Sequence, residues 1–190
     1  MAVVTGLRER GQRVDVEVDG ARWRTVPVEA AAHVGLRVGL ELDRPRLRQL
    51  RRELRQSAAG SRAVRALRAR DLAVAELDRR LERAGFTGGE RAAAVERLER
   101  VGLVDDRRVA VARASALAAR GRGDAAIRWD LEQRGVAEEL VREALDGLEP
   151  ERERAAAIVA ARGRGPSTAR LLARRGFGED AVETASGAEE

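Results

Sequence analysis

Arginines are the residues of this sequence with the clearest capacity to bind a ligand, because many of them gather in three short segments. The string ARGRG occurs at residues 119–123 and again at 161–165. A third segment, Arg44–Arg55, contains six arginines and a single acid, Glu53. A guanidinium group presents N–H donors in a planar fork, which suits the oxygens of carboxylates and phosphates. The chemistry that these segments could do is therefore the binding of acidic groups.

The arginines of these segments, with a few neighbours, are the candidate residues for binding a partner or DNA. In the two ARGRG strings, flexible glycines would let the guanidinium groups reach carboxylates or phosphates. The alternative is that the glycines only end helices and that the loops are solvated. For Arg44–Arg55, the alternatives are a phosphate-contacting surface and a bridging helix with a solvated face. The candidates are Arg44, Arg48, Arg51, Arg52, Arg55, Arg68, Arg70, Arg120, Arg122, Arg128, Arg162 and Arg164.

Catalytic, cofactor and metal sites are not expected. The sequence has no cysteine, which excludes disulfides and thiolate chemistry, and it has no phosphate-binding P-loop string. Its single histidine, His33, lies in an alanine-rich segment and is expected to be structural rather than a general base. The pair Asp105–Asp106 could be imagined as a metal site, but two adjacent acids at a helix start favour capping and dipole roles. We therefore expect a binding protein and not an enzyme.

Composition limits the setting of the protein without naming a ligand. The 37 basic residues are all arginine, and 32 acids offset most of them to leave a net charge of +5. This balance permits nucleic-acid binding but does not require it. No long apolar run or signal-like start is present, so we expect a cytoplasmic protein with no membrane partner. Only 2% of the residues are aromatic, which favours a core of small residues in close-packed helices; Phe86, Trp129 and Phe177 are expected in that core.

A repeated pattern indicates which elements must position the arginines. The pattern of leucine, three residues, glycine and an apolar residue occurs at Leu81–Phe86, Leu131–Val136 and Leu172–Phe177. A recurrence of this kind predicts three tandem units of three short helices each. The units are expected at residues 61–104, 105–148 and 149–185, followed by a disordered tail at 186–190.

Capping residues and helical periodicity set the expected helix bounds. In the first unit, Asp71 and Thr87 are expected N-caps, and Glu90 completes a capping box with Thr87. The expected helices are Ser61–Arg70, Asp71–Ala84 and Thr87–Arg100 in the first unit, Asp105–Arg120, Asp124–Arg134 and Ala137–Leu148 in the second, and Glu151–Arg162, Pro166–Arg175 and Glu179–Thr184 in the third.

The chain before the units follows a different period. Two alternating runs joined by Asp19–Gly20 predict a β-hairpin, and Val3–Leu7 can supply a third strand. A short helix is expected from Pro27 or Val28 to His33. Residues 1–42 are thus expected to form a small, autonomous α+β module. Residues 43–60 are expected to form a basic helical linker with one apolar stripe.

Two strings carry a resemblance to a known family. The strings GLVDDRRVA (residues 102–110) and RGRGDAAIRWDLEQRGV (residues 120–136) resemble the RecX family of regulatory proteins. The sequence has Asp71 where family members often have Ser or Thr, and Val109 where many have an aromatic residue. The resemblance implies a mainly α fold in which tandem three-helix repeats, elongated and curved, follow a small β-hairpin-containing module.

The resemblance also implies a function. RecX-like proteins bind the RecA filament on single-stranded DNA, lie along its groove, and suppress its ATPase, strand-exchange and coprotease activities in recombination, DNA repair and the SOS response. A monomeric RecA modulator is therefore expected, with single-stranded or double-stranded DNA as a further possible partner. Two alternatives remain open: a direct DNA-binding helical-repeat protein, and a purely structural helical-repeat adaptor.

Overall fold

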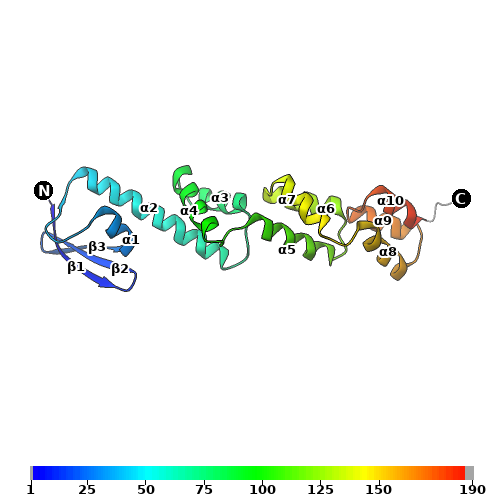
Figure 1. Ribbon diagram of the computed structural model, residues 1–190, viewed down its shortest axis with the longest axis horizontal. Helices are drawn as coiled ribbons and strands as arrows, with labels where there is room; N and C mark the ends of the chain where they lie inside the picture. The colour runs from blue at the N-terminus through cyan, green and yellow to red at the C-terminus, as the bar shows by residue number, and fades with distance from the viewer. Residues whose placement is uncertain (1, 187–190) are drawn as a thin grey trace. The chain divides into compact units, whose positions relative to one another are not determined.

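The computed structural model describes residues 2–186, which form ten helices and four strands (Figure 1). They divide into two compact units. The first unit contains the chain up to Ala69 together with Arg80–Arg100, and the second contains Arg70–Arg79 together with the chain from Val101 onward. Across residues 2–186, every helix is too short or too polar to cross a membrane.

The first unit begins with a four-stranded antiparallel sheet. Strands β1 (Ala2–Arg10), β2 (Arg13–Val18), β3 (Ala21–Pro27) and β4 (Glu41–Leu42) lie in the order β3-β2-β1-β4. Asp19 and Gly20, with φ of 50° and 80°, form the turn between β2 and β3. Positive φ at both central residues is what a tight primed turn requires. The predicted hairpin is confirmed.

Helices α1 (Val28–Val34) and α2 (Arg44–Leu67) complete the core of this sheet. The side chain of Asp43 caps α2 by accepting from the N–H of Arg46 at 2.8 Å. Leu50 of α2 is buried with the strand residues, and two further leucines of the helix pack beside it. The boundary predicted between residues 42 and 43 therefore cuts through this core. Its buried members are Val4, Val14, Val16, Val26, Ala31, Val34, Leu40, Leu42 and Leu50.

Helix α2 is a single helix, and the separate helix predicted from Ser61 is wrong. Its C-terminal half contains buried alanines at helical spacing, Ala59, Ala63 and Ala66, and α2 packs on α4 (Gly88–Arg100). This packing outweighs the weak helix propensity of Gly60, whose cost is about 1 kcal/mol.

The predicted cap of α3 (Val74–Arg83) is also wrong, whereas that of α4 is confirmed in part. Asp71 lies outside α3, because the helix begins three residues later. At the start of α4, the N–H of Thr87 donates to the Oε2 of Glu90 at 2.9 Å. This bond is one half of the predicted capping box.

Six helices follow in the second unit. They are α5 (Asp106–Ala118), α6 (Asp124–Arg134), α7 (Glu138–Asp146), α8 (Glu151–Arg162), α9 (Pro166–Arg174) and α10 (Glu179–Ser186). The structure reproduces the predicted bounds of α6 and α8, and Ser186 ends α10 rather than opening a tail. The rest of the predicted tail, residues 187–190, lies outside the described residues.

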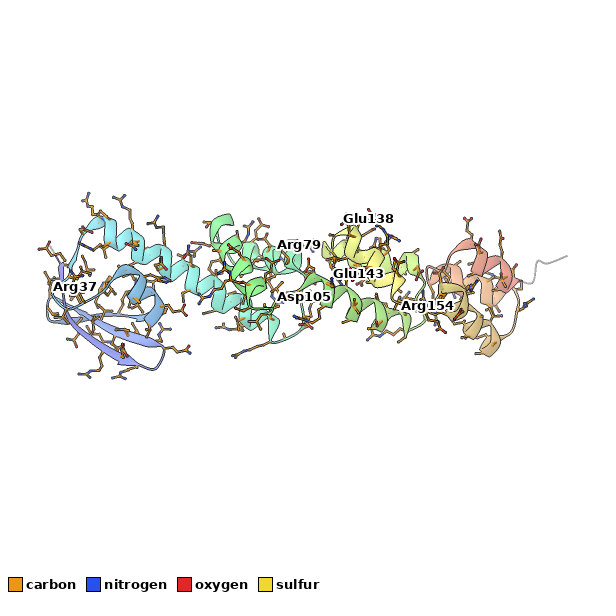
Figure 2. The ribbon with its side chains drawn as sticks, viewed as in Figure 1. Arg37, Arg79, Asp105, Glu138, Glu143 and Arg154 are labelled. Atoms are coloured by element: carbon orange, nitrogen blue, oxygen red, sulfur yellow. The ribbon has the colours of Figure 1, made fainter. Side chains whose placement is uncertain are left out.

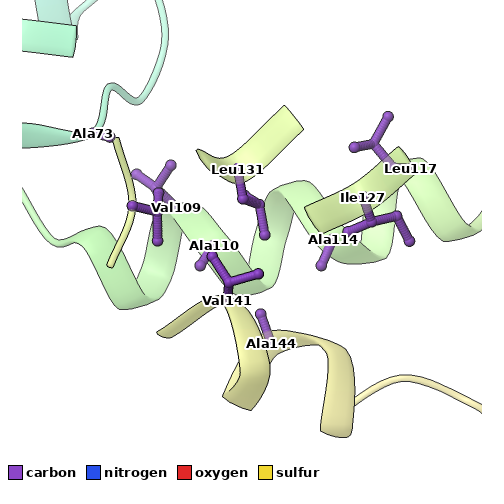
Figure 3. Packing of buried hydrophobic residues seen from close by; sticks show 10 residues of the cluster. Ala73, Val109, Ala110, Ala114, Leu117, Ile127, Leu131, Val141 and Ala144 are labelled. Carbon is purple, nitrogen blue, oxygen red and sulfur yellow. The ribbon is translucent and has the colours of Figure 1, made fainter. Parts of the chain in front are cut away.

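Small side chains build the cores of the second unit. In one cluster, alanine and valine of α5 pack against Ile127 and Leu131 of α6 and against Val141 of α7 (Figure 3). A second cluster, formed by the last three helices and the loop between α9 and α10, contains Leu172 and Phe177. Trp129 belongs to neither cluster and is 63% exposed, so its predicted place in the core is wrong.

Candidate binding surfaces and the joints that position them

Residues of α5 and α6 hold the start of α3 within the second unit. The N–H of Val74 donates to the Oδ1 of Asp106 at 2.8 Å, so an acid of α5 caps a helix that precedes it in the chain. Gly135, which ends α6 with φ of 83°, lies so close to α3 that a Cβ on it would be 2.5 Å from the Cβ of Ala75. We call these contacts the first joint.

Residues near α8 and α9 hold the start of α6 in the same way. The N–H of Asp124 donates to the Oε1 of Glu151 at 2.5 Å, and the N–H of Ala125 donates to the carbonyl of Gly176 at 3.1 Å. Gly176 has φ of 77°, and a Cβ on it would lie 2.6 Å from the backbone N of Ala126. We call these contacts the second joint. The two joints share one design: an acid at the start of a later helix caps an earlier one, and a left-handed glycine packs against it.

Arg154 of α8 fastens the second joint (Figure 2). Its guanidinium donates to the carbonyl of Arg122 at 2.8 Å, pairs with the carboxylate of Asp124, and lies 6.0 Å from the centre of the Phe177 ring. The side chain is only 9% exposed. Its charge is therefore committed to the fold.

A network of arginines and acids surrounds the first joint. Arg113 donates to both oxygens of Asp130 at 2.9 and 2.8 Å, and Arg134 donates to Asp130 at 2.7 Å. Arg134 also reaches Glu76 at 3.1 Å, as does Arg70. We call these five residues the joint network. Each guanidinium in it has a carboxylate partner.

The joint network lowers the pKa of both its acids. Hydrogen bonds from Arg113 and then Arg134 outweigh partial burial and hold the pKa of Asp130 well below its usual range. For Glu76, partial burial acts to raise the pKa, but Arg70 and Arg134 together outweigh it and the pKa is lowered. Both acids are therefore charged at neutral pH. Arg79 adds to the first joint by donating to the carbonyls of Gln133 and Arg134, each at 3.1 Å (Figure 2).

The N-terminal half of α2 carries arginines that, unlike those of the joint network, have no carboxylate partner among residues 2–186. Arg44, Arg48 and Arg52 lie four residues apart on one helix face with Arg51 beside them, and the last three of these arginines line an open hollow with Pro45. All four are exposed, and within residues 2–186 their side chains have no hydrogen-bond or ion-pair partner. We call them the α2 arginine face. Uncompensated positive charge on one face attracts anions.

The glycines of the first ARGRG loop have a structural task. Gly123 donates its N–H to the carbonyl of Arg175 at 2.9 Å, and a Cβ on it would lie 2.2 Å from the carbonyl oxygen of Gly176. In the second loop, Gly165 donates to the carbonyl of Ala185 at 2.8 Å. Gly123 thus allows a close backbone approach, whereas a Cβ on Gly163 or Gly165 of the second loop would meet open space. The side chains of the loop arginines are exposed and make no polar contact with any described residue: Arg120, Arg122, Arg162 and Arg164.

The other candidate arginines differ in their surroundings. Arg55 donates to both oxygens of Glu90 at 3.0 Å and lies 4.9 Å above the centre of the Phe86 ring, and its hydrogen bond lowers the pKa of Glu90 to about 2. Arg70 belongs to the joint network. Arg68 is exposed and Arg128 is half-buried, and neither side chain has a partner among residues 2–186.

The residues considered for catalysis or metal binding have separate structural roles. His33 is exposed, and its Nδ1 lies 2.9 Å from the Oε2 of Glu53. Asp105 caps α5 by accepting from the N–H of Arg108 at 3.0 Å, and Asp106 caps α3. Both acids of this pair therefore cap helices, as predicted. Within the described part of the chain, no group of three or more His, Asp or Glu side chains is arranged to hold a metal ion.

Sequence reasoning missed the residues that build the second joint and the exposure of Trp129. Glu151 and Arg154, which build the second joint, were not candidates, although Pro150 followed by an acid marks a helix start at Glu151. Trp129 was assigned to the core because it lies between Ile127 and Leu131. Since it is two residues from each, it lies about 160° around the helix from both of them, and this angle could have shown its exposure.

The sequence is similar to a family profile and to three known proteins. The profile described as RecX, second three-helix domain, matches residues 105–145. The regulatory protein RecX of Chromohalobacter salexigens is 36% identical over 65% of this chain and 87% of its own length, and that of Halorhodospira halophila is 33% identical over 66% and 84%. The regulatory protein RecX of Deinococcus radiodurans is 33% identical over 73% of this chain and 71% of its own.

Solved structures show the same fold. The crystal structure of a regulatory protein RecX covers all of both chains, with a TM-score of 0.82 and 20% identity. The crystal structure of RecX from Lactobacillus salivarius covers 69% of this chain and 94% of its own, with a TM-score of 0.60 and 16% identity. With the capped three-helix repeats, the strand module before them and relatives matched over most of their length, the chain belongs to the RecX family of regulatory proteins.

Proposed function

We propose that this protein binds the RecA filament on single-stranded DNA and lowers its ATPase, strand-exchange and coprotease activities. The observation that carries the proposal is the match over 71–87% of the length of three proteins named regulatory protein RecX. The joints support it, because rigidly capped helix units can present side chains in a fixed order to a repeating partner.

An ATPase titration tests the proposal. RecA filaments on single-stranded DNA are assayed with increasing amounts of the protein, and ATP hydrolysis is expected to fall at comparable or lower molar ratios. A pull-down of RecA with and without single-stranded DNA and nucleotide shows whether the assembled filament is needed. Unchanged ATP hydrolysis and filament length at several-fold excess of the protein would refute the proposal.

Direct DNA binding is a second candidate function, and the α2 arginine face favours it. Four exposed guanidinium groups without acidic partners among residues 2–186 could contact phosphates along a strand. Salt dependence separates the two candidates. Direct binding to single-stranded DNA should weaken with a log-log slope of about −0.7 for each phosphate contacted. A protein-directed modulator should instead bind only when RecA is present.

A further inference from the structure

The outer face of α6 presents a tryptophan that the fold does not use. The side chains of Ile127 and Leu131 are fully buried in the α5–α6–α7 core, while Trp129 between them is 63% exposed. Trp129 is one of only two tryptophans in the chain. A large exposed aromatic side chain costs solvation free energy and is a frequent centre of binding energy in protein interfaces.

The repeats themselves show that the fold needs no aromatic residue at this position. Trp129 lies two residues before Leu131, the leucine of the repeated pattern. The corresponding residues of the other two repeats are Arg79 and Arg170, which are both exposed. The same helix is therefore built twice with arginine where α6 has tryptophan.

Charges around Trp129 differ between its two sides. Arg128 precedes it, and α6 starts directly after the loop that carries Arg120 and Arg122; none of these three side chains has a partner among residues 2–186. One turn later on the exposed face comes Glu132, which is likewise without a partner in that part of the chain. A chain of phosphates crossing the tryptophan would meet this carboxylate. A protein surface can match both sides, because its charges vary from residue to residue.

From this arrangement we infer that the outer face of α6 docks onto a protein, with Trp129 in an apolar pocket that has carboxylates on the side facing Arg128 and the first ARGRG loop. The inference rests on the proposed function and assigns this face to the contact with the filament protein. Trp129 is the anchor, and the arginines orient it.

Substitution of Trp129 tests the docking face in the full-length protein. The variant Trp129→Arg installs the residue type that the other two repeats carry, and Trp129→Gln removes the ring without adding charge. We expect both variants to melt like the wild type and to bind RecA filaments on single-stranded DNA about tenfold or more weakly in a co-sedimentation assay, as for a central anchor residue. The matched control is Trp23→Gln, which removes the other partly exposed tryptophan and should leave filament binding unchanged.

The outcomes distinguish the inference from the proposed function. If the wild type binds filaments and the two Trp129 variants bind equally well, the docking face is overturned while the proposed function stands. If the wild type binds no filament, the proposed function fails, and the docking face fails with it.

Fluorescence tests nucleic acid as the alternative occupant. In the variant Trp23→Phe, Trp129 is the only tryptophan, and the chain has no tyrosine. A single-stranded oligonucleotide added alone should leave its emission unchanged if the face binds protein. Strong quenching would show that bases stack on Trp129 and would overturn the inference.

Discussion

The α2 arginine face and the joint network contain the same residue type in opposite situations. In the joint network, Arg113 and Arg134 each donate to Asp130 at distances of 2.9 Å or less. On the α2 arginine face, Arg48 and Arg52 are exposed and have no partner among residues 2–186. Because a paired arginine is neutralised where it stands, only the unpaired ones project a field toward a ligand.

Arginine density along the sequence therefore does not locate a binding surface. Arg55 lies in the densest basic segment, yet its guanidinium group is bound by Glu90 and lies over the Phe86 ring. Its carboxylate partner is 35 residues away in the chain. Substitutions at the joints should therefore lower the stability of the protein and leave ligand binding unchanged. Substitutions on the α2 arginine face should weaken ligand binding and leave the stability unchanged.

The largest effect on stability is expected from crowding a joint. Gly176→Ala places a Cβ 2.6 Å from the backbone N of Ala126, in addition to the cost of φ at 77° for a residue with a side chain. We expect a loss of about 3 kcal/mol in the free energy of unfolding, from overpacking together with the left-handed conformation. Urea denaturation measures it.

The matched control for this variant is Gly35→Ala. Gly35 ends α1 in the left-handed conformation, with φ of 65° and ψ of 39°, but it has open space where a Cβ would lie. It should lose only about 1 to 2 kcal/mol, because the conformational cost alone remains. Equal losses at the two glycines would show that the close approach at the second joint contributes nothing.

Opening the joint network should have the next largest effect. Asp130→Asn removes the charge that Arg113 and Arg134 share, and the side chain of Asp130 is only 20% exposed. We expect a loss of about 2 kcal/mol in the free energy of unfolding, as for a hydrogen bond to a charged group. The control in the same helix is Glu132→Gln, an exposed carboxylate with no partner within residues 2–186, which should leave the melting temperature unchanged. Similar melting temperatures for both variants would contradict the role given to the network.

Low pH should weaken the arginine–carboxylate pairs of Glu90, Asp130 and Glu76 and should not affect the α2 arginine face, which has no carboxylate partner among residues 2–186. The pKa of Glu90 is lowered from 4.5 to about 2, and the pKa values of Asp130 and Glu76 are also lowered. A lowered folded-state pKa gives stability that is complete above the unfolded-state value and is lost as the pH falls toward the folded-state value. Thermal melts should therefore show a falling melting temperature between about pH 4.5 and pH 2. In Glu90→Gln the fall should be smaller, and an identical fall would argue against the Arg55–Glu90 pair.

The smallest effect on stability is expected on the α2 arginine face. Replacing Arg48 and Arg52 with alanine should change the free energy of unfolding by less than about 0.5 kcal/mol at each site. If the face contacts phosphates, the magnitude of the salt slope for single-stranded DNA should fall by about 1.4, since each contact contributes about 0.7. The control removes the same charge from the other half of the helix, at the exposed residues Arg62 and Arg65. Equal changes in both variants would show a general charge effect rather than a site.

Local signals predicted much of the secondary structure. Asp19–Gly20 set the hairpin, and the bounds of α6 and α8 follow from helical periodicity with Pro150 and Gly135 as end signals. Errors arose where a distant contact replaced a local one. Asp71 was expected to cap α3, but the carboxylate of Asp106 accepts from the N–H of Val74, the first residue of that helix.

The sequence alone is enough to predict the family, the repeats, the strand module and the caps formed by neighbouring residues, because these depend on spacings of a few residues. Which arginines are unpaired depends instead on how the chain folds. Arg134 and Arg122 look alike in the sequence, yet one is bound by Glu76, 58 residues away, and the side chain of the other makes no polar contact with any described residue. Pairing depends on where chain segments meet in space, and an unpaired charge is what a ligand can bind.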